Sequence, residues 1–188
     1  MKRAFDVVAS ALFLLVSWPV LLVILIAIRL QNSGSPLFVQ VRIGKHGRPF
    51  TCYKLRTMYS GTLNVPTHQV NVASVTPLGR QLRRFKIDEL PQLFNVLMGE
   101  MSLVGPRPCL PSQTDLVEAR RRLGVLEVLP GITGLAQVNG VDMSDPLRLA
   151  EIDAQYVRTH SFLGDFKLIL ATLRGQGVGV DQVVRDNT

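Results

Sequence analysis

The feature that most constrains the fold is an almost unbroken apolar stretch near the amino terminus, residues 7–28. As a helix with about 1.5 Å of rise per residue, its roughly 22 residues are long enough to cross a bilayer. Pro19 interrupts the middle, and a proline inside a helix removes one backbone hydrogen bond and kinks the helix. The hydroxyl group of nearby Ser17 is able to satisfy the freed carbonyl group. The stretch therefore predicts a membrane helix with a kink at Ser17 to Pro19.

Cations flank this stretch on both sides: Lys2 and Arg3 before it, and Arg29, Arg42, Lys45 and Arg48 after it. Positively charged flanks stay in the cytoplasm, so both helix ends are predicted to lie on the cytoplasmic side. A re-entrant helix that dips into the membrane, bends at Pro19 and returns agrees with the charges and the kink. A single spanning anchor is the alternative. A cleaved signal peptide is disfavoured because the apolar region is too long and no small-residue cleavage site follows.

Composition limits the number of domains and the kinds of partner. The 188 residues leave room for one domain of ordinary size after the membrane helix, so we expect a helix over 1–34 and one catalytic or binding domain over 35–188. The hydrophobic share of 47% and the mean hydropathy of +0.24 point to membrane contact. A formal charge of +7 favours anionic partners: acidic lipid headgroups, phosphorylated small molecules or nucleic acid. The two cysteines and three histidines lack metal-site spacing, so no structural metal is predicted.

Residues 37–58 alternate β-formers on both sides of a Gly-Lys-His-Gly turn, which predicts a β-hairpin. Lys54 and Arg56 share one face of the returning strand because side chains alternate with a period of two. They are either solvated cations of an edge strand or a pair that binds a diphosphate. Thr76 and Pro77 then predict the start of a basic amphipathic helix, which lies either at an anionic membrane surface or on the domain core.

Two adjacent carboxylates, Asp88 and Glu89, follow a cationic run and precede Pro91 and an apolar segment. With Pro91 in the first turn of a helix, one of these acids would stand at or next to its N-cap. They are then either a capping pair, or an anion site with its own nucleophile, since an ionised Asp beside a bound phosphate can attack phosphorus. Further on, two prolines fix the backbone around Arg107, which suits bidentate phosphate recognition.

Short helices are predicted after residue 145 and after Ser161, and a short β-like stretch lies near residue 132. The expected fold is a small, mostly helical α/β domain with a short β-hairpin or sheet, joined to a monotopic membrane helix.

At this point the chain resembles the monotopic bacterial phosphoglycosyl transferases, the bacterial sugar transferase family, over nearly its whole length. Six segments in one order carry the resemblance: Lys2 to Asp6, Ser17 to Pro19, Tyr53 to Met58, Asp88 to Leu93, Met101 to Pro108 and Pro130 to Gly140. Each alone would be weak, but the ordered set is specific. The chain looks like the small form that consists of the catalytic domain alone.

The resemblance implies an enzyme that moves a sugar 1-phosphate from a UDP-sugar to polyprenol phosphate and releases UMP. Asp88 would form a phosphosugar-aspartyl intermediate, and Asp88 with Glu89 would hold Mg²⁺. The residues implied to bind the phosphates or the nucleotide are Lys54, Arg56, Arg83, Pro106, Arg107 and Gln137, with Asp165 as an acidic support. Direct transfer without the intermediate is one alternative, and a non-catalytic basic membrane-surface protein is another.

The segment Val141-Asp142-Met143 departs from the commoner pattern, in which arginine follows Gly140. Such variants resemble transferases of N-acetylated amino sugars. The implied place is the bacterial cytoplasmic membrane, with the catalytic domain on its cytoplasmic face against an anionic leaflet. No nucleic-acid partner is expected, and a homodimer is left open.

Overall fold

The computed structural model describes residues 1–32, 34–62 and 74–175. The helices are α1 (Lys2–Gln31), α2 (Pro77–Arg84), α3 (Gln92–Met98), α4 (Thr114–Arg122), α5 (Leu135–Val138), α6 (Pro146–Thr159) and α7 (Phe162–Leu173). The strands are β1 (Leu37–Ile43), β2 (Pro49–Leu55), β3 (Ser102–Val104) and β4 (Gly131–Thr133). The predicted class, a mostly helical α/β domain with short sheets, is confirmed. Residue 33, inside the predicted linker, lies outside the described residues.

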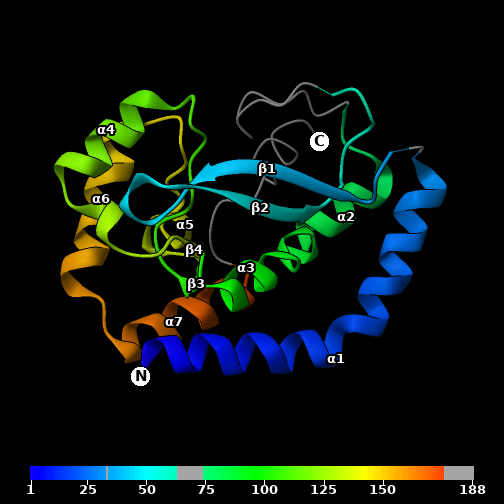
Figure 1. The fold of residues 1–188 in the computed structure, drawn as a ribbon, viewed down its shortest axis with the longest axis horizontal. Coiled ribbons are helices and arrows are strands. Elements are labelled where there is room, and N and C mark those ends of the chain that lie inside the picture. Colours follow the sequence, from blue (N-terminus) through cyan, green and yellow to red (C-terminus); the bar gives the residue numbers. More distant parts are fainter. Residues whose placement is uncertain (33, 63–73, 176–188) are drawn as a thin grey trace.

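Helix α1 runs along one edge of the molecule and then bends sharply towards the far end of the hairpin (Figure 1). Pro19 lies inside this helix, as the kink prediction requires. The hydroxyl oxygen of Ser17 is buried but has no hydrogen-bond partner in the described part of the chain, so it does not satisfy a carbonyl group freed by the proline. By its length and composition the helix is long and apolar enough to cross a membrane.

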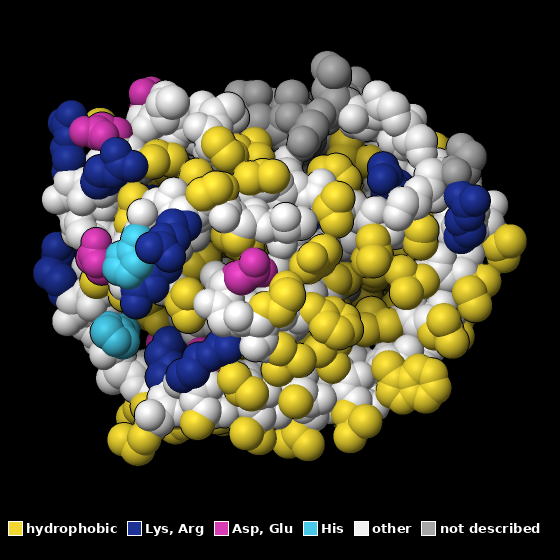
Figure 2. Space-filling model, viewed as in Figure 1, with side chains coloured by type: hydrophobic (Ala, Val, Ile, Leu, Met, Phe, Trp, Pro, Cys, Tyr) yellow, Lys and Arg dark blue, Asp and Glu magenta, His cyan; other side chains and the backbone are white. Residues whose placement is uncertain are grey.

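One stripe of α1 packs on the domain, and the rest of its surface is apolar and exposed. The inward residues recur every four or seven positions, as one face of a helix does: Asp6, Ser10, Leu14, Leu21 and Ile28. The last three share a core cluster with Leu55, Leu82 and Leu93 from the remainder of the chain. The predicted helix and the predicted domain therefore form one packed unit. Exposed side chains such as Phe13, Trp18 and Val23 face outwards, and hydrophobic residues gather along the lower and right-hand edges of the molecule (Figure 2).

The first turn of α1 is joined to the last helix of the domain. Lys2 Nζ lies 2.5 Å from Asp165 Oδ2 at the start of α7, and it also donates to the Val104 carbonyl at 3.1 Å. Tyr156 of α6 donates to Asp165 Oδ1 at 2.8 Å. The rings of Phe5 and Phe162 pack edge to face beside these contacts, with centroids 5.3 Å apart. Figure 1 accordingly shows α7 beside the amino-terminal part of α1.

The predicted hairpin is confirmed: β1 and β2 are antiparallel, with Phe38 opposite Lys54 and a tight turn at Lys45–Gly47. Asn95 of α3, fully buried, locks this sheet to α3. Its amide nitrogen donates to Thr51 O at 2.7 Å, and its amide oxygen accepts from Tyr53 N at 3.2 Å. These bonds fix β2, and with it Lys54, relative to the chain that leads into α3.

The two other strands, β3 and β4, are parallel, with Val104 opposite Thr133. Glycines allow the backbones to meet just past this pair. A Cβ atom at Gly131 would lie 2.0 Å from Gly105 N, and one at Gly134 would lie 2.2 Å from Gly105 O. No side chain fits there, so the turns that follow β3 and β4 are held in direct backbone contact.

Candidate active site

Asp88 and Glu89 lie in a single 3-10 turn, Ile87–Glu89, between α2 and α3. The predicted capping arrangement is wrong in detail. Pro91 is the N-cap residue of α3 rather than its first helical residue, and no side chain caps that helix. The turn begins after Lys86, whose φ of 55° is a left-handed conformation that is costly for a residue with a Cβ. Asp88 and Glu89 therefore do not cap α3, and the left-handed conformation of Lys86 constrains the turn that carries them.

Glu89 is clamped between two cations from different elements. Lys54 Nζ of β2 lies 2.9 Å from Glu89 Oε1, and Arg107 NH2 lies 2.6 Å from the same oxygen. Burial alone would raise the pKa of Glu89, but the charges of Arg107 and Lys54 outweigh it and hold the pKa well below its ordinary value. Glu89 is thus a fixed anion at neutral pH.

Asp88 differs from its neighbour. Across the described ranges it makes no hydrogen bond or ion pair, and its side chain is half-buried. Burial raises its pKa, the nearby Glu89 carboxylate raises it further, and Lys54, Arg83 and Arg107 only partly offset these effects. A carboxylate that is unpaired, partly accessible and short of positive charge is suited to attack an electrophile or to bind a cation.

Arg83 of α2 provides a further cation beside Asp88. Its Nε donates to Thr57 Oγ1 at 2.8 Å, which orients the guanidinium group. Its NH1 atom is buried with no hydrogen-bond partner among the described residues. Because buried donors are nearly always satisfied, this atom is a natural donor to a bound anion. Thr57 was not singled out from the sequence, although it stands within the quoted segment Tyr53 to Met58.

The turn that carries Arg107 is held by two buried arginines. Arg120 NH1 of α4 donates to Arg107 O at 2.8 Å, and Arg42 NH1 of β1 donates to Pro108 O at 3.0 Å. Arg120 is itself fixed by Asp153 of α6, which accepts at 3.0 and 2.6 Å. None of these supporting residues was predicted as part of the site. Their spacing in sequence gives no signal, because three separate elements bring them together.

Comparison with known proteins identifies the family of this chain. A family model described as bacterial sugar transferase matches residues 1–176. The chain belongs to that family.

Several relatives match the transferase over most of its length. It is 44% identical to an uncharacterised sugar transferase, EpsL, of Bacillus subtilis, over 93% of this chain and 86% of the relative. It is 43% identical to a UDP-glucose:undecaprenyl-phosphate glucose-1-phosphate transferase of Caulobacter vibrioides, over 92% and 68%. It is 42% identical to an undecaprenyl-phosphate glucose phosphotransferase of Komagataeibacter xylinus, over 92% of this chain but only 35% of that protein.

Three further residues that were predicted for the site, Pro106, Gln137 and Arg56, make contacts with residues other than Asp88 and Glu89. Pro106 is buried, and its carbonyl group accepts from Gly131 N at 2.9 Å. Gln137 of α5 donates to Ile132 O at 2.9 Å, while its amide oxygen is buried without a partner in the described part of the chain. Arg56 donates to Ser35 O at 2.5 Å and lies over the Phe38 ring. Its observed contacts are thus with Ser35 and Phe38, at the start of the hairpin, and not with the Asp88–Glu89 pair.

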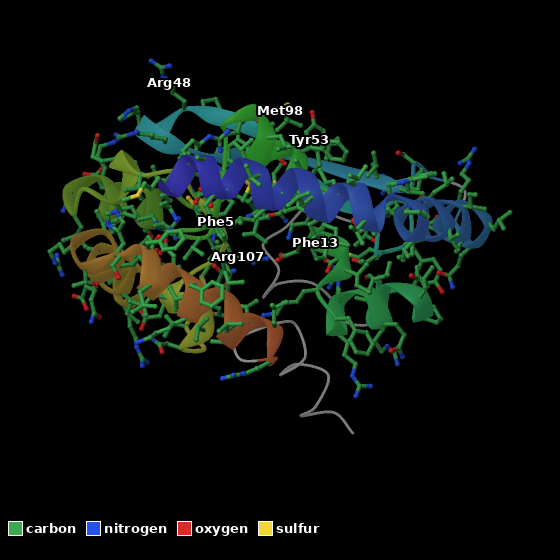
Figure 3. The ribbon with its side chains drawn as sticks, turned by 90° about the horizontal axis from the view of Figure 1, so that it is seen from below. Phe5, Phe13, Arg48, Tyr53, Met98 and Arg107 are labelled. Carbon is green, nitrogen blue, oxygen red and sulfur yellow. The ribbon has the colours of Figure 1, made fainter. Side chains whose placement is uncertain are left out.

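Asp165 of the transferase accepts hydrogen bonds from two residues that hold the end of β3. It binds Lys2 and Tyr156, and both of those side chains also donate to Val104 O, at 3.1 Å each. Val104 ends β3 immediately before the turn that carries Arg107. Figure 3 shows Arg107 between α1 and α7. Asp165 therefore links α1 to the strand that leads into the turn of this arginine.

Proposed function

We propose that this transferase moves a sugar 1-phosphate from a UDP-sugar to polyprenol phosphate, through a covalent phosphosugar intermediate on Asp88. The observation that carries the proposal is the unequal pair: Lys54 and Arg107 hold Glu89 as an anion, while Asp88 makes no hydrogen bond or ion pair with any residue that the structure describes. The printed functions of the Caulobacter and Komagataeibacter relatives, with undecaprenyl phosphate as acceptor and glucose as sugar, support the same reaction class.

In the first half-reaction a carboxylate oxygen of Asp88 attacks the phosphorus atom that bears the sugar. A bond forms between Asp88 and this phosphorus, the phosphoanhydride bond breaks, and UMP leaves with the bonding electron pair. Arg83 and Arg107 stabilise the charge on the phosphate oxygens, because fixed cations in a partly buried site stabilise the transition state. In the second half-reaction a phosphate oxygen of the polyprenol phosphate attacks the same phosphorus, and the Asp88 carboxylate is released.

The adjacent carboxylates fit Mg²⁺, which commonly takes one or two carboxylates together with substrate phosphates and water. Within the described part of the chain Asp88 has no hydrogen-bond or ion-pair partner, which leaves it able to act as a ligand. Both cations on Glu89 contact the same oxygen, Oε1. No group of three or more His, Cys, Asp or Glu side chains gathers in the described ranges, so a cage made only of protein ligands is not the fit. Bound there, the ion would neutralise charge between the carboxylates and the diphosphate.

The membrane arrangement is part of the proposal. We place α1 as a re-entrant helix bent at Pro19 in the bacterial cytoplasmic membrane, with the catalytic domain on the cytoplasmic face. The exposed apolar surface of α1 and its cationic flanks support this placement. A site joined to such a helix can reach both a water-soluble donor and an acceptor buried in lipid. A covalent intermediate lets the two substrates enter in turn.

For the sugar, we propose an N-acetylated amino sugar, on the basis of Val141-Asp142-Met143 after Gly140. Val141 is buried, and Asp142 accepts from Ser144 N at 2.9 Å, so this segment is a fixed turn. UDP-glucose is the second candidate, because relatives at 42–43% identity are named for glucose.

The decisive test is an intact mass of the purified protein after incubation with Mg²⁺ and each UDP-sugar, without polyprenol phosphate. A mass gain equal to one sugar phosphate, absent in Asp88→Asn, supports the covalent route, and the donor that produces it names the sugar. Without a gain, UMP release that depends on polyprenol phosphate would replace the covalent route by direct transfer. Loss of both signals with every donor would refute the proposed reaction, and full activity in Asp88→Asn would refute the role of this residue.

A further inference from the structure

Arg42, the last but one residue of β1, is a buried cation that has no role in the proposed reaction. Its exposed fraction is 8%. Its guanidinium group donates to Pro108 O at 3.0 Å and to the side-chain oxygen of Gln40. Both acceptors are neutral, and no Asp or Glu side chain forms an ion pair with Arg42 anywhere in residues 1–32, 34–62 and 74–175.

Arg120 gives the useful comparison. It also donates to a carbonyl group of the Arg107 turn, but its charge is compensated by Asp153 at 2.6 Å. Burying a guanidinium group without a carboxylate is costly, and a buried charge normally finds a counter-ion. Two arginines therefore support neighbouring carbonyl groups of one turn, and among the described residues only Arg120 has a carboxylate partner.

The charges that act on Arg42 include two residues of the active site, Arg107 and Glu89. The pKa of Arg42 is lowered to about 10, first by burial and next by the positive charge of Arg107. Glu89 acts in the opposite direction but is the weakest of the named influences. An anion that binds at Arg107 would relieve the repulsion between the two arginines and would add the attraction that Arg42 lacks.

We propose that Arg42 is a positioning residue for the diphosphate of the nucleotide donor. It holds the Pro108 carbonyl group and so fixes Arg107, and its uncompensated buried charge increases the affinity of the site for the diphosphate. This inference rests on the proposed function, because it takes the donor's diphosphate as the anion at Arg107. Arg42 would thus act through Arg107 and would not itself touch the reacting atoms.

The test measures binding of UDP and of UMP by calorimetry, with no acceptor and no turnover. Arg42→Gln keeps a donor for Pro108 O but removes the charge, and Arg42→Lys keeps the charge. We expect UDP to bind about tenfold more weakly to Arg42→Gln, since a unit charge a few ångströms from a partly buried anion has at least this effect. The affinity for UMP, which has one phosphate, should fall less than the affinity for UDP in Arg42→Gln. Arg42→Lys should retain most of the wild-type affinity for UDP.

Arg48 provides the matched control, because it is a cation of the same hairpin that projects away from the body of the molecule (Figure 3). Arg48→Gln removes the same charge and should change UDP affinity less than twofold. The thermal midpoint of each free variant is measured alongside. Because Arg42→Gln removes an uncompensated buried charge, its midpoint should fall by no more than a few degrees.

Two outcomes would overturn the inference. Wild-type affinity for UDP in Arg42→Gln would show that the charge does not serve the donor, and equal losses of UDP and UMP affinity, not restored in Arg42→Lys, would reduce Arg42 to a structural support. Either result leaves the proposed reaction intact. Failure of the wild-type protein to bind UDP at all would refute the inference and the proposed donor together.

Discussion

The Arg120–Asp153 pair allows the most demanding test of how the active site is supported. Its side chains are 3% and 2% exposed, and both Nε and NH2 of Arg120 donate to one oxygen of Asp153. Asp153→Asn leaves the guanidinium group buried without its counter-ion. Breaking a buried pair in this way typically costs about 3–5 kcal/mol, which in a chain of this size lowers the thermal midpoint by about 6–20 °C.

The assay is thermal unfolding of the purified protein in detergent micelles, followed by circular dichroism. Glu118→Gln is the matched control, because Glu118 pairs with Arg122 at 2.9 Å on the same helix but in an exposed position. That pair should contribute less than about 0.5 kcal/mol to the free energy of unfolding. The reasoning is refuted if Asp153→Asn costs no more than Glu118→Gln.

A double variant separates stability from function. Replacing Arg120 by Met together with Asp153 by Leu removes both charges, and such replacements are often neutral or stabilising. We therefore expect the double variant to regain most of the stability that Asp153→Asn loses. It still lacks the bond from Arg120 to Arg107 O, so transfer activity should stay reduced. Full activity in the double variant would show that this bond does not position Arg107.

Three further predictions concern single residues. Asp88→Asn should raise the thermal midpoint of the free protein by a few degrees at neutral pH while abolishing turnover. Burial and the Glu89 carboxylate raise the folded-state pKa of Asp88 above its ordinary value, so the wild-type protein loses stability as the pH rises through this raised pKa. The gain in Asp88→Asn should therefore be larger at pH 7.5 than at pH 4.5. Thr57→Val should lower kcat/KM about tenfold by freeing Arg83, and Thr57→Ser should not, because a hydrogen bond to a charged group is worth about 1.5–3 kcal/mol. Gly131→Ala should destabilise the fold by about 1–3 kcal/mol or more in chemical denaturation, because its Cβ atom would lie 2.0 Å from Gly105 N.

Local patterns predicted local structure well. The alternation around the Lys45–Gly47 turn and the cap at Thr76, which accepts from Gly79 N at 2.9 Å, are each decided by a few neighbouring residues. The helix after Pro91 was placed one residue too early, because the sequence does not show that Lys86 adopts a left-handed conformation and closes a separate 3-10 turn.

The supports of the site could not be predicted in the same way. Arg42, Arg120 and Asp153 resemble ordinary strand and helix residues, and they matter only because three elements meet at one turn. Ser17 shows the opposite case: its position suggested a hydrogen bond to the kinked backbone, and the fold leaves its hydroxyl oxygen without a partner in the described ranges.

The bond between Lys2 and Asp165 joins residues separated by 163 positions. Other contacts of α1 need far less of the chain: Leu14, Leu21 and Ile28 pack with Leu55, Leu82 and Leu93. Lys2 also donates to Val104 O at 3.1 Å. Asp165 lies on α7, so its bond to Lys2 can form only after the chain from β1 to α7 has been made. Contacts between residues so distant in sequence form late in folding. We therefore expect α1 to dock on the domain first, and the bond to Asp165 to fix β3 and the turn with Arg107 afterwards.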